Sequence, residues 1–444
     1  MTEHLRNTPH NLTRNPRLET PMTLTPAAEV YHGDCIETMN AMPPESVDAI
    51  VTDPPYGLGF MGKKWDDLPP SREWAEACFR VLKPGGHIAA FGGTRTWHRL
   101  AVAIEDAGFE MRDSLAWLYG SGFPKSHDVS KGIDRLAGAE REVIGTETRM
   151  NEPSGIVNVG QGERVAIERK ITAPATPEAV KWDGWGTALK PAFEPIVLAR
   201  KPLAEKTVAR NVLAHGTGAI NIDASRIETD DNLNGGTSGG ILRLHGCHTV
   251  DELRALAEAG GKTPDGRDAR KTLARYIANR ERVGEYVQPS GRWPANVLLD
   301  QHAAAWVDEQ SGVTKSSVRP ATGGPIFKSS QSFKGGGEQV DIGDRGHADQ
   351  GGASRFFYTA KAPKSERPNV DGVQHPTVKP LAIMRWLLRL VTPPGGTVLD
   401  PFAGSGATIE AALIEGFNPI GIELEAEYLP LIQHRIDRQG GDES

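Results

Sequence analysis

The chain has 444 residues, roughly two to three domains' worth, and can bury a core without disulfides or metal ions. Its 50 Lys and Arg against 57 Asp and Glu give a net charge of −7, which excludes a generic polycation such as a histone-like protein. Nucleic-acid binding is not excluded, because a mildly acidic chain can carry a basic cleft. The 50 glycines and 32 prolines predict a compact core with long loop-rich insertions.

The cysteines and the N-terminal segment indicate a reducing, intracellular setting. Cys35, Cys78 and Cys247 are odd in number and far apart, so no disulfide framework is predicted. His245 and His248 flank Cys247, but they have no partner cluster, and we predict no metal site. Residues 1–28 lack a signal peptide and are expected to form a disordered tail, and no apolar run is long enough to span a bilayer.

The first part of the chain alternates between strand and helix patterns. Short apolar runs that stop at loops predict strands at 30–32, 47–52, 87–91 and 111–118. Apolar residues at helical spacing predict helices at 35–41, 71–82 and 97–107, with Ser71 as an N-cap and Pro84-Gly85-Gly86 as a terminator. This alternation is typical of an open α/β sheet.

The middle of the chain is irregular, and regularity returns at its end. Residues 120–187 are polar and rich in glycine, proline and charge, and are expected to form a loop insertion before a strand at 193–199. From 203 to 374, one helix at 251–259 stands among short apolar pieces at 219–222, 295–299 and 355–358. The last part predicts helices at 381–391, 406–415 and 426–436 and strands at 397–399 and 419–422.

A small-residue turn, Asp400-Pro401-Phe402-Ala403-Gly404-Ser405-Gly406, joins a predicted strand to a predicted helix. Its glycines let the backbone approach a ligand, and the helix N-terminus offers unpaired amides. Glu423 ends the next strand, where α/β nucleoside-binding folds hold ribose hydroxyls. The turn lacks the GxGxxG spacing and carries Asp400, so S-adenosylmethionine suits it better than NAD. Plain helix–strand packing is the alternative.

A second motif, Asp53-Pro54-Pro55-Tyr56, follows a buried strand. Asp53 offers an acceptor oxygen, the prolines fix the backbone carbonyls, and Tyr56 supplies an aromatic face. Such a group suits a planar ring bearing an exocyclic amine. A simple Asp-Pro turn beside a packed tyrosine is the alternative.

The two motifs together resemble those of DNA amino-methyltransferases. Asp53-Pro54-Pro55-Tyr56 is similar to their catalytic motif, and the turn at 400–406 is similar to their cofactor-binding motif. The order, with the catalytic motif first and the cofactor motif last, resembles the permuted β group, and the middle resembles phage and prophage members. His375-Pro376-Thr377-Val378-Lys379-Pro380 resembles a segment of that group that contacts the methionine part of the cofactor.

The resemblance implies a Rossmann-like, circularly permuted α/β sheet with strand order 3-2-1-4-5-7-6 and a long irregular inserted target-recognition region. It implies S-adenosylmethionine as cofactor and Asp53, Pro54, Pro55 and Tyr56 as catalytic residues. The implied cofactor-binding residues are Asp34, Thr377, Lys379, Asp400, Pro401, Phe402, Gly404, Ser405, Gly406, Thr408 and Glu423.

The predicted organisation follows from these motifs. Residues 29–202 form the catalytic half of the methyltransferase domain, 203–374 the putative target-recognition region and 375–444 the cofactor-binding half. Within 261–292, basic residues outnumber acidic ones, and Arg270, Lys271 and Arg275 are predicted to contact DNA. An ordinary solvated helix is the alternative. Trp182 and Trp185 fit either a ligand cleft or core packing.

The implied activity is site-specific methylation of double-stranded DNA in the cytoplasm of a bacterial or phage-infected cell. Asp at the first position of the catalytic motif favours adenine N6 over cytosine N4. The alternatives are an RNA or protein N-methyltransferase and a non-catalytic DNA-binding protein. A restriction-modification role with a separate nuclease, and a homodimer, are left open.

Overall fold

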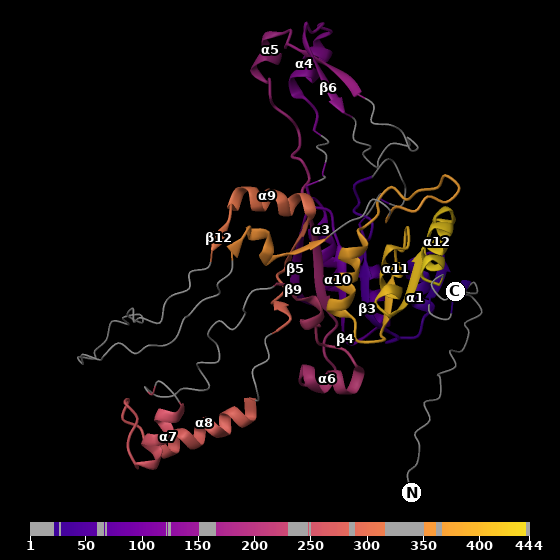
Figure 1. Ribbon diagram of the computed structural model, residues 1–444. Coiled ribbons are helices and arrows are strands. Elements are labelled where there is room, and N and C mark those ends of the chain that lie inside the picture. The colour runs from indigo at the N-terminus through magenta and orange to yellow at the C-terminus, as the bar shows by residue number, and fades with distance from the viewer. Residues whose placement is uncertain are drawn as a thin grey trace. The chain divides into compact units, whose positions relative to one another are not determined.

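The computed structural model describes residues 22–25, 28–59, 66, 69–120, 122, 126–150, 166–229, 247, 250–283, 289–315, 350–360 and 366–440. These fall in two compact units (Figure 1). The first comprises Met1–Asn221, Asn296–Ala303 and Thr359–Ser444, and the second comprises Ile222–Ala295 and Ala304–Tyr358. Among the described residues, no helix is long and apolar enough to cross a membrane.

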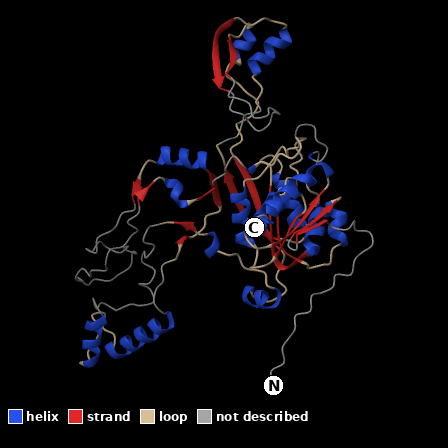
Figure 2. Cartoon of the chain, turned by 45° about the vertical axis from the view of Figure 1, so that its right-hand side comes forward, coloured by secondary structure: helices blue, strands red, loops and turns tan. Residues whose placement is uncertain are grey.

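A ten-stranded sheet forms the centre of the first unit (Figures 1 and 2), in the order β1-β2-β16-β15-β3-β4-β8-β5-β11-β14. The strands are β1 (Met22–Thr25), β2 (Ala28–His32), β3 (Val47–Thr52), β4 (Leu82–Phe91), β5 (Glu110–Leu118), β8 (Phe193–Arg200), β11 (Val297–Asp300), β14 (Tyr358–Ala360), β15 (Thr397–Asp400) and β16 (Asn418–Glu423). Seven adjacent strands of this sheet, from β2 across to β5, match the spatial order 3-2-1-4-5-7-6 that the resemblance implied. In that numbering β15 is strand 1, β16 strand 2, β2 strand 3, β3 strand 4, β4 strand 5, β5 strand 6 and β8 strand 7.

The direction of these strands fixes which residues meet at one edge. β2, β16, β15, β3 and β4 run parallel to one another, so their carboxyl ends lie at the same edge of the sheet. β8 runs antiparallel to both β4 and β5, so its amino end reaches that edge instead. Ligands bind at this edge in open α/β sheets, at the point where the strand order reverses.

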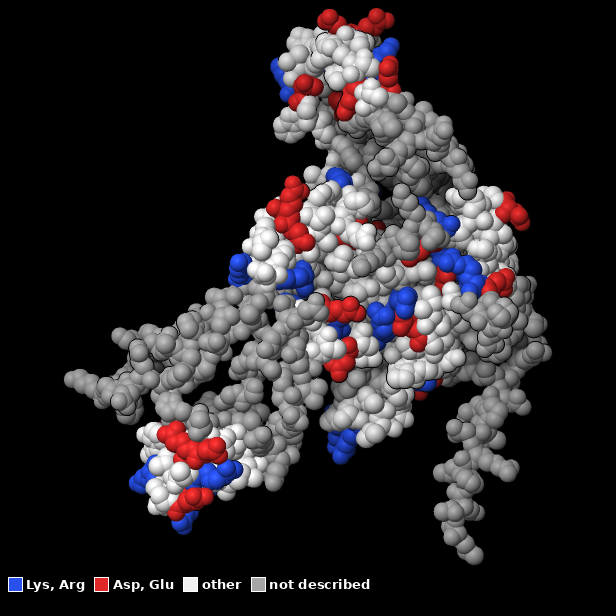
Figure 3. All heavy atoms as spheres, viewed as in Figure 1, with Lys and Arg blue, Asp and Glu red and all other residues white. Residues whose placement is uncertain are grey.

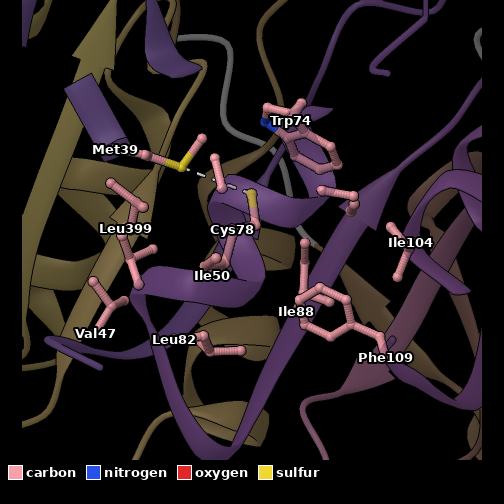
Figure 4. Close-up of a cluster of buried hydrophobic side chains, with 14 of the residues drawn as sticks. Met39, Val47, Ile50, Trp74, Cys78, Leu82, Ile88, Ile104, Phe109 and Leu399 are labelled. Carbon is pink, nitrogen blue, oxygen red and sulfur yellow. Dashed lines mark hydrogen bonds between the residues drawn. The ribbon is translucent and has the colours of Figure 1, made fainter. Parts of the chain in front are cut away.

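Helices cover both faces of the sheet (Figure 2). They are α1 (Cys35–Ala41), α2 (Arg72–Val81), α3 (Trp97–Asp106), α10 (Leu381–Val391), α11 (Ala407–Ile414) and α12 (Leu429–Gly440). α6 (Val208–His215) lies instead at the start of β4, where its Asn211 donates to the Pro84 carbonyl. On one face Met39 of α1 and Trp74 and Cys78 of α2 pack against Ile50 of β3 (Figure 4). On the other face Ile409 and Ile432 pack against Val30. The strands are therefore buried on both sides, as their continuous apolar runs predict.

Most predicted elements of the two α/β blocks are confirmed within one or two residues at each end, and Ser71 caps α2 as expected. Pro84-Gly85-Gly86 does not terminate that helix. α2 ends at Val81, and the three residues lie inside β4, where the register with β3 shifts. A Cβ on Gly86 would lie 2.7 Å from Leu82 Cγ, so the close approach rather than a helix end requires this glycine.

Two expectations about irregular regions are wrong. Met22–Thr25 form β1, which pairs with β2, so the tail predicted for 1–28 is not disordered throughout; residues 1–21 lie outside the described residues. The region 120–187 holds α4 (Val129–Ala137), β6 (Val143–Met150), β7 (Ala166–Thr172) and α5 (Pro177–Lys181). In that region Trp182 and Trp185 are exposed and contact each other edge to face, which excludes core packing; the ligand cleft stays a prediction.

The second unit contains more helix than the sequence pattern indicated. Its elements are β9 (Ile227–Glu228), α7 (Val250–Glu258), α8 (Ala269–Val283), β10 (Gly291–Arg292), most of α9 (Gln301–Ser311), β12 (Thr314–Lys315) and β13 (Gln350–Gly351). Leu253 and Ala257 of α7 pack against Ala269 and Leu273 of α8. The unit begins at Ile222, whereas the predicted target-recognition region begins at residue 203. His245 and His248 lie outside the described residues.

Candidate active site

The two sequence motifs meet at the carboxyl edge of the sheet because β3 pairs with β15. Leu399 lies opposite Ile50, so Asp53 and Asp400 follow neighbouring strands although they are far apart in sequence. The Thr52 hydroxyl donates a 2.6 Å hydrogen bond to Asp400 Oδ1 and joins the ends of the two strands directly. The structure therefore brings the predicted catalytic and cofactor motifs together in one site.

The Asp400 carboxylate organises the turn that follows β15. Thr52 and the Phe402 amide donate to its Oδ1, and the Thr408 hydroxyl donates to its Oδ2 at 2.5 Å. Burial raises the pKa of Asp400 to about 6, despite these hydrogen bonds, which act in the opposite direction. Asp400 is thus bound on both oxygens by its own chain and holds the turn in shape.

The turn itself needs glycine at two positions. Gly404 and Gly406 have φ of 52° and 79°, and a Cβ on Gly404 would lie 3.2 Å from His375 Nε2. Gly406 precedes α11 and no side chain caps that helix, so its first amides are open to a ligand. Pro401 and Ser405 are buried, and the Phe402 ring lies 5.8 Å from the Trp74 ring.

Glu423 lies at the carboxyl end of β16, beside the turn. Its carboxylate accepts from the Gly404 amide at 2.7 Å and from the Glu425 amide at 2.8 Å. Burial outweighs these bonds and raises the pKa of Glu423 to about 7. The Gly33 amide donates to the Glu423 carbonyl, which places the end of β2 next to it; Asp34, exposed, caps α1 through its carboxylate.

The Asp53-Pro54-Pro55-Tyr56 motif follows β3 as a loop that hydrogen bonds to Asp66 hold in place. Asp66 Oδ1 accepts from the amides of Tyr56 and Gly57 at 2.6 and 3.1 Å, and its Oδ2 accepts from Leu58. A Cβ on Gly93 would lie 3.0 Å from Tyr56 Cδ2, so the ring lies directly on glycine backbone. Neither Asp66 nor Gly93 has a sequence signal, because both reach Tyr56 only through the fold.

Lys379 lies among the catalytic side chains. Its ammonium donates to Asp53 Oδ2 at 2.6 Å and to the Tyr56 hydroxyl at 3.1 Å, and lies 3.3 Å from Glu194 Oε2. Burial lowers the pKa of Lys379, but the carboxylates of Asp53 and Glu194 outweigh it and raise the pKa above its ordinary value. The sequence grouped Lys379 with the cofactor residues; its polar contacts among the described residues are to Asp53 and Tyr56 of the catalytic motif and to Glu194.

The neighbouring residues of the predicted set are also accounted for. Thr377 lies two residues before Lys379, and its amide donates to His375 Nδ1 at 3.3 Å. The ring of His375 contacts Tyr428 edge to face, with 4.5 Å between centroids. This places the 375–380 segment against the turn at Gly404. Among the described residues, no three His, Cys, Asp or Glu side chains form a candidate metal site.

The α8 residues predicted to contact DNA lie in the second unit and differ in their surroundings. Arg270 Nε donates to the Ala257 carbonyl at 2.8 Å and so ties α8 to the end of α7. Lys271 and Arg275 are exposed and four residues apart, hence on one face of the helix. In Figure 3, basic and acidic atoms are interspersed over the α7–α8 pair. Lys271 and Arg275 therefore remain candidates, and Arg270 has a structural contact.

We predict that Glu423→Gln changes the pH dependence of stability. The folded-state pKa of Glu423 is raised from 4.5 to about 7, so the protonated carboxyl stabilises the folded protein. This contribution to the free energy of unfolding is fully present below pH 4.5 and is lost as the pH rises towards 7. Between these pH values the free energy of unfolding of the wild type, relative to the variant, will fall by on the order of 3 kcal/mol. Urea unfolding at several pH values measures this. Glu168→Gln, at an exposed carboxylate of β7, is the control, and equal slopes for wild type and Glu423→Gln would contradict the prediction.

Comparisons with known proteins identify the family of this chain. A family model described as DNA methylase, of the N6 and N4 methyltransferases, matches residues 47–434. The chain is 25% identical over 235 residues to the type II methyltransferase M.HindIII of Haemophilus influenzae, covering 43% of this chain and 64% of that protein. It is 34% identical over 111 residues to M.HpaI of Haemophilus parainfluenzae, covering 23% of this chain and 35% of that protein. The chain thus spans less than two thirds of the length of these relatives.

Two solved structures are also similar. The complex of M1.HpyAVI with SAM has a TM-score of 0.35 at 16% identity, over 92% of this chain and 99% of that one. PvuII DNA methyltransferase, described as cytosine-N4-specific, has a TM-score of 0.37 at 13% identity, over 93% of this chain and 86% of that one. Since the family model covers most of the chain, the protein belongs to the N6/N4 DNA methylase family.

Proposed function

We propose that this protein transfers a methyl group from S-adenosylmethionine to an exocyclic amine of a DNA base. The single observation that supports this most is the junction of β3 with β15. It sets the acceptor atoms of Asp53 beside a glycine turn and a buried acid that suit a cationic nucleoside. The family membership agrees with this assignment.

The residues at the turn fit S-adenosylmethionine. Asp400, Glu423 and Asp34 gather negative charge at the strand ends, which suits a ligand with an ammonium and a sulfonium group. The open amides at the start of α11 suit its carboxylate, and Glu423 suits the ribose hydroxyls. When bound, this cofactor supplies an electrophilic methyl group.

The catalytic motif would hold the target base and its amine. In our proposal the base is flipped out of the duplex and stacks on Tyr56, while Asp53 and the Pro54 carbonyl accept hydrogen bonds from the amine. The lone pair of the amine nitrogen forms the N–C bond as the methyl's S–C bond breaks with its electrons on sulfur. The nitrogen, now cationic, loses a proton to Asp53 and through it to solvent. Positioning and electrostatic complementarity supply most of the acceleration.

Adenine N6 is the proposed target atom. The support is the aspartate at the first position of the catalytic motif, which in this family favours adenine over cytosine. Cytosine N4 requires the same in-line attack by an exocyclic amine, so the same residues would serve it. The methylated nucleoside itself distinguishes the two.

The second unit is proposed to read the DNA target, and the strand order suggests a circular permutation of the catalytic fold. After the edge strand β1, the chain continues the sheet with β2 and completes it with β16, and these two strands pair in parallel. Such neighbouring ends are what a circular permutation requires. The long segment between β8 and α10 is then an insertion in the catalytic fold, and it contains α8 with its basic residues.

We expect Asp53→Ala to lower the rate of methyl transfer at least about 10³-fold, because the amine loses its charged acceptor. Binding of S-adenosylmethionine, measured by calorimetry, will stay within about twofold of wild type, since Asp400 and Glu423 are untouched. Transfer is measured with labelled cofactor and unmodified DNA. Asp106→Ala, at an exposed carboxylate at the end of α3, is the matched control. Near-normal turnover of Asp53→Ala would refute the mechanism.

Charge reversal on α8 tests the DNA contact. Lys271→Glu with Arg275→Glu is expected to weaken DNA binding and to lower the slope of log affinity against log salt by about 2, because two phosphate contacts are lost. Arg254→Glu on α7, also exposed and in the same unit, is the control. Arg270→Glu will instead lower the unfolding temperature, because its bond to Ala257 is lost. If the slope of the double variant equals that of the wild type, α8 is only a solvated helix.

A further inference from the structure

Glu194 lies at the catalytic centre without belonging to either motif. It is the second residue of β8, which runs antiparallel to β4 and β5, so its carboxylate reaches the edge where the parallel strands end. Its Oε2 accepts from the Tyr56 hydroxyl at 3.1 Å and lies 3.3 Å from the Lys379 ammonium. Burial, together with the Glu194 carboxylate, raises the pKa of the nearby Tyr119 phenol to about 12.

The hydrogens in this cluster are shared between two carboxylates. The Lys379 ammonium has three hydrogens and three acceptors within reach, on Asp53, Tyr56 and Glu194. The Tyr56 hydroxyl has one hydrogen but two carboxylate acceptors, Asp53 Oδ1 at 3.0 Å and Glu194 Oε2 at 3.1 Å. Burial and these two carboxylates raise the pKa of Tyr56 well above its ordinary value, so the hydroxyl keeps its hydrogen.

The sharing of Lys379 and Tyr56 between two carboxylates determines whether Asp53 can accept a target amine. Lys379 donates to Oδ2 of Asp53 and Tyr56 donates to Oδ1, so each oxygen that the amine needs already has a donor. Both donors also lie within reach of Glu194. They can therefore release Asp53 to the amine and keep a carboxylate partner, instead of being left buried and unpaired.

The charges of the cluster favour the same step. Asp53, Glu194 and Lys379 sum to −1, and all three side chains are at most 22% exposed. An amine nitrogen that has just bonded the methyl carbon carries a positive charge. Without the Glu194 carboxylate the cluster would be neutral, and the lysine ammonium would repel the new cation in a poorly solvated site.

We propose that Glu194 is a positioning residue for methyl transfer, which holds Lys379 and Tyr56 so that Asp53 can accept the target amine. This inference rests on the proposed function. Glu194 does not touch the reacting atoms in this role. It acts through Lys379 and Tyr56, and it adds the second negative charge that stabilises the cationic product nitrogen before its proton leaves.

The test compares Glu194→Gln, which keeps size and hydrogen bonding but removes the charge, with Glu194→Asp, which keeps the charge. We expect Glu194→Gln to lower kcat about 10- to 100-fold, with the Kd of S-adenosylmethionine unchanged within about twofold. Lys379 will then lose its proton at lower pH, so the alkaline limb of the kcat–pH profile moves to lower pH. Glu194→Asp will return that limb towards its wild-type position. Glu73→Gln, at an exposed carboxylate of α2, is the control.

The outcomes are distinguishable. A wild-type protein that binds the cofactor but transfers no methyl to DNA overturns the proposed function, and this inference with it. An active wild type with a Glu194→Gln variant of equal kcat and unchanged pH profile overturns the inference alone. If Glu194→Gln and Glu194→Asp lose kcat equally and neither moves the alkaline limb, Glu194 serves only packing. If Glu194→Gln does not fold, a Glu194→Asp variant of wild-type kcat and pH profile supports the charge role, and one that has lost its activity overturns it.

Discussion

The pairing of β3 with β15 is the constraint on which the site depends. It brings the end of the third strand in the chain against the end of the next-to-last, and the hydrogen bond from Thr52 to Asp400 joins the two ends. Asp400 in turn holds Thr408 and Phe402, and so fixes the turn at the start of α11. The buried core around Ile50 and Leu399 keeps both strands in place. Catalytic and cofactor motifs become one site only through this contact.

The second feature of the site is concentrated charge in a buried setting. Asp53, Glu194 and Lys379 share hydrogens with Tyr56, and Asp400 and Glu423 lie at the adjacent strand ends. Burial raises the pKa of Asp400 to about 6 and that of Glu423 to about 7, so ionisation of either acid in the folded protein costs stability. Binding of a cationic ligand would offset that cost. The same two buried acids therefore lower the stability of the protein and favour its binding of a positively charged cofactor.

Much of this arrangement could be predicted from the sequence, and the exceptions have physical causes. Buried parallel strands such as 47–52 are continuous apolar runs, and Asp53 and Asp400 stand directly after them, so their meeting followed from strand order. Glu194 and Asp66 could not be found in this way, because only the fold brings the start of an antiparallel strand and a residue ten positions along the chain to Tyr56. An acid at the start of the otherwise apolar strand Phe193–Arg200 was the one available signal for Glu194. A helix in the region of α8 was only the alternative prediction, because the basic residues outweighed the helical spacing of Ala269, Leu273 and Tyr276.

Nucleoside analysis of treated DNA tests the central claim most directly. Purified protein is incubated with S-adenosylmethionine and unmodified double-stranded DNA, and the DNA is digested to nucleosides for mass spectrometry. A methyl group on an exocyclic amine is the required result, and N6-methyladenine is the predicted one; N4-methylcytosine would keep the mechanism and change the base. Methylation at a ring carbon, or no methylated nucleoside from folded protein that binds the cofactor, would contradict the account.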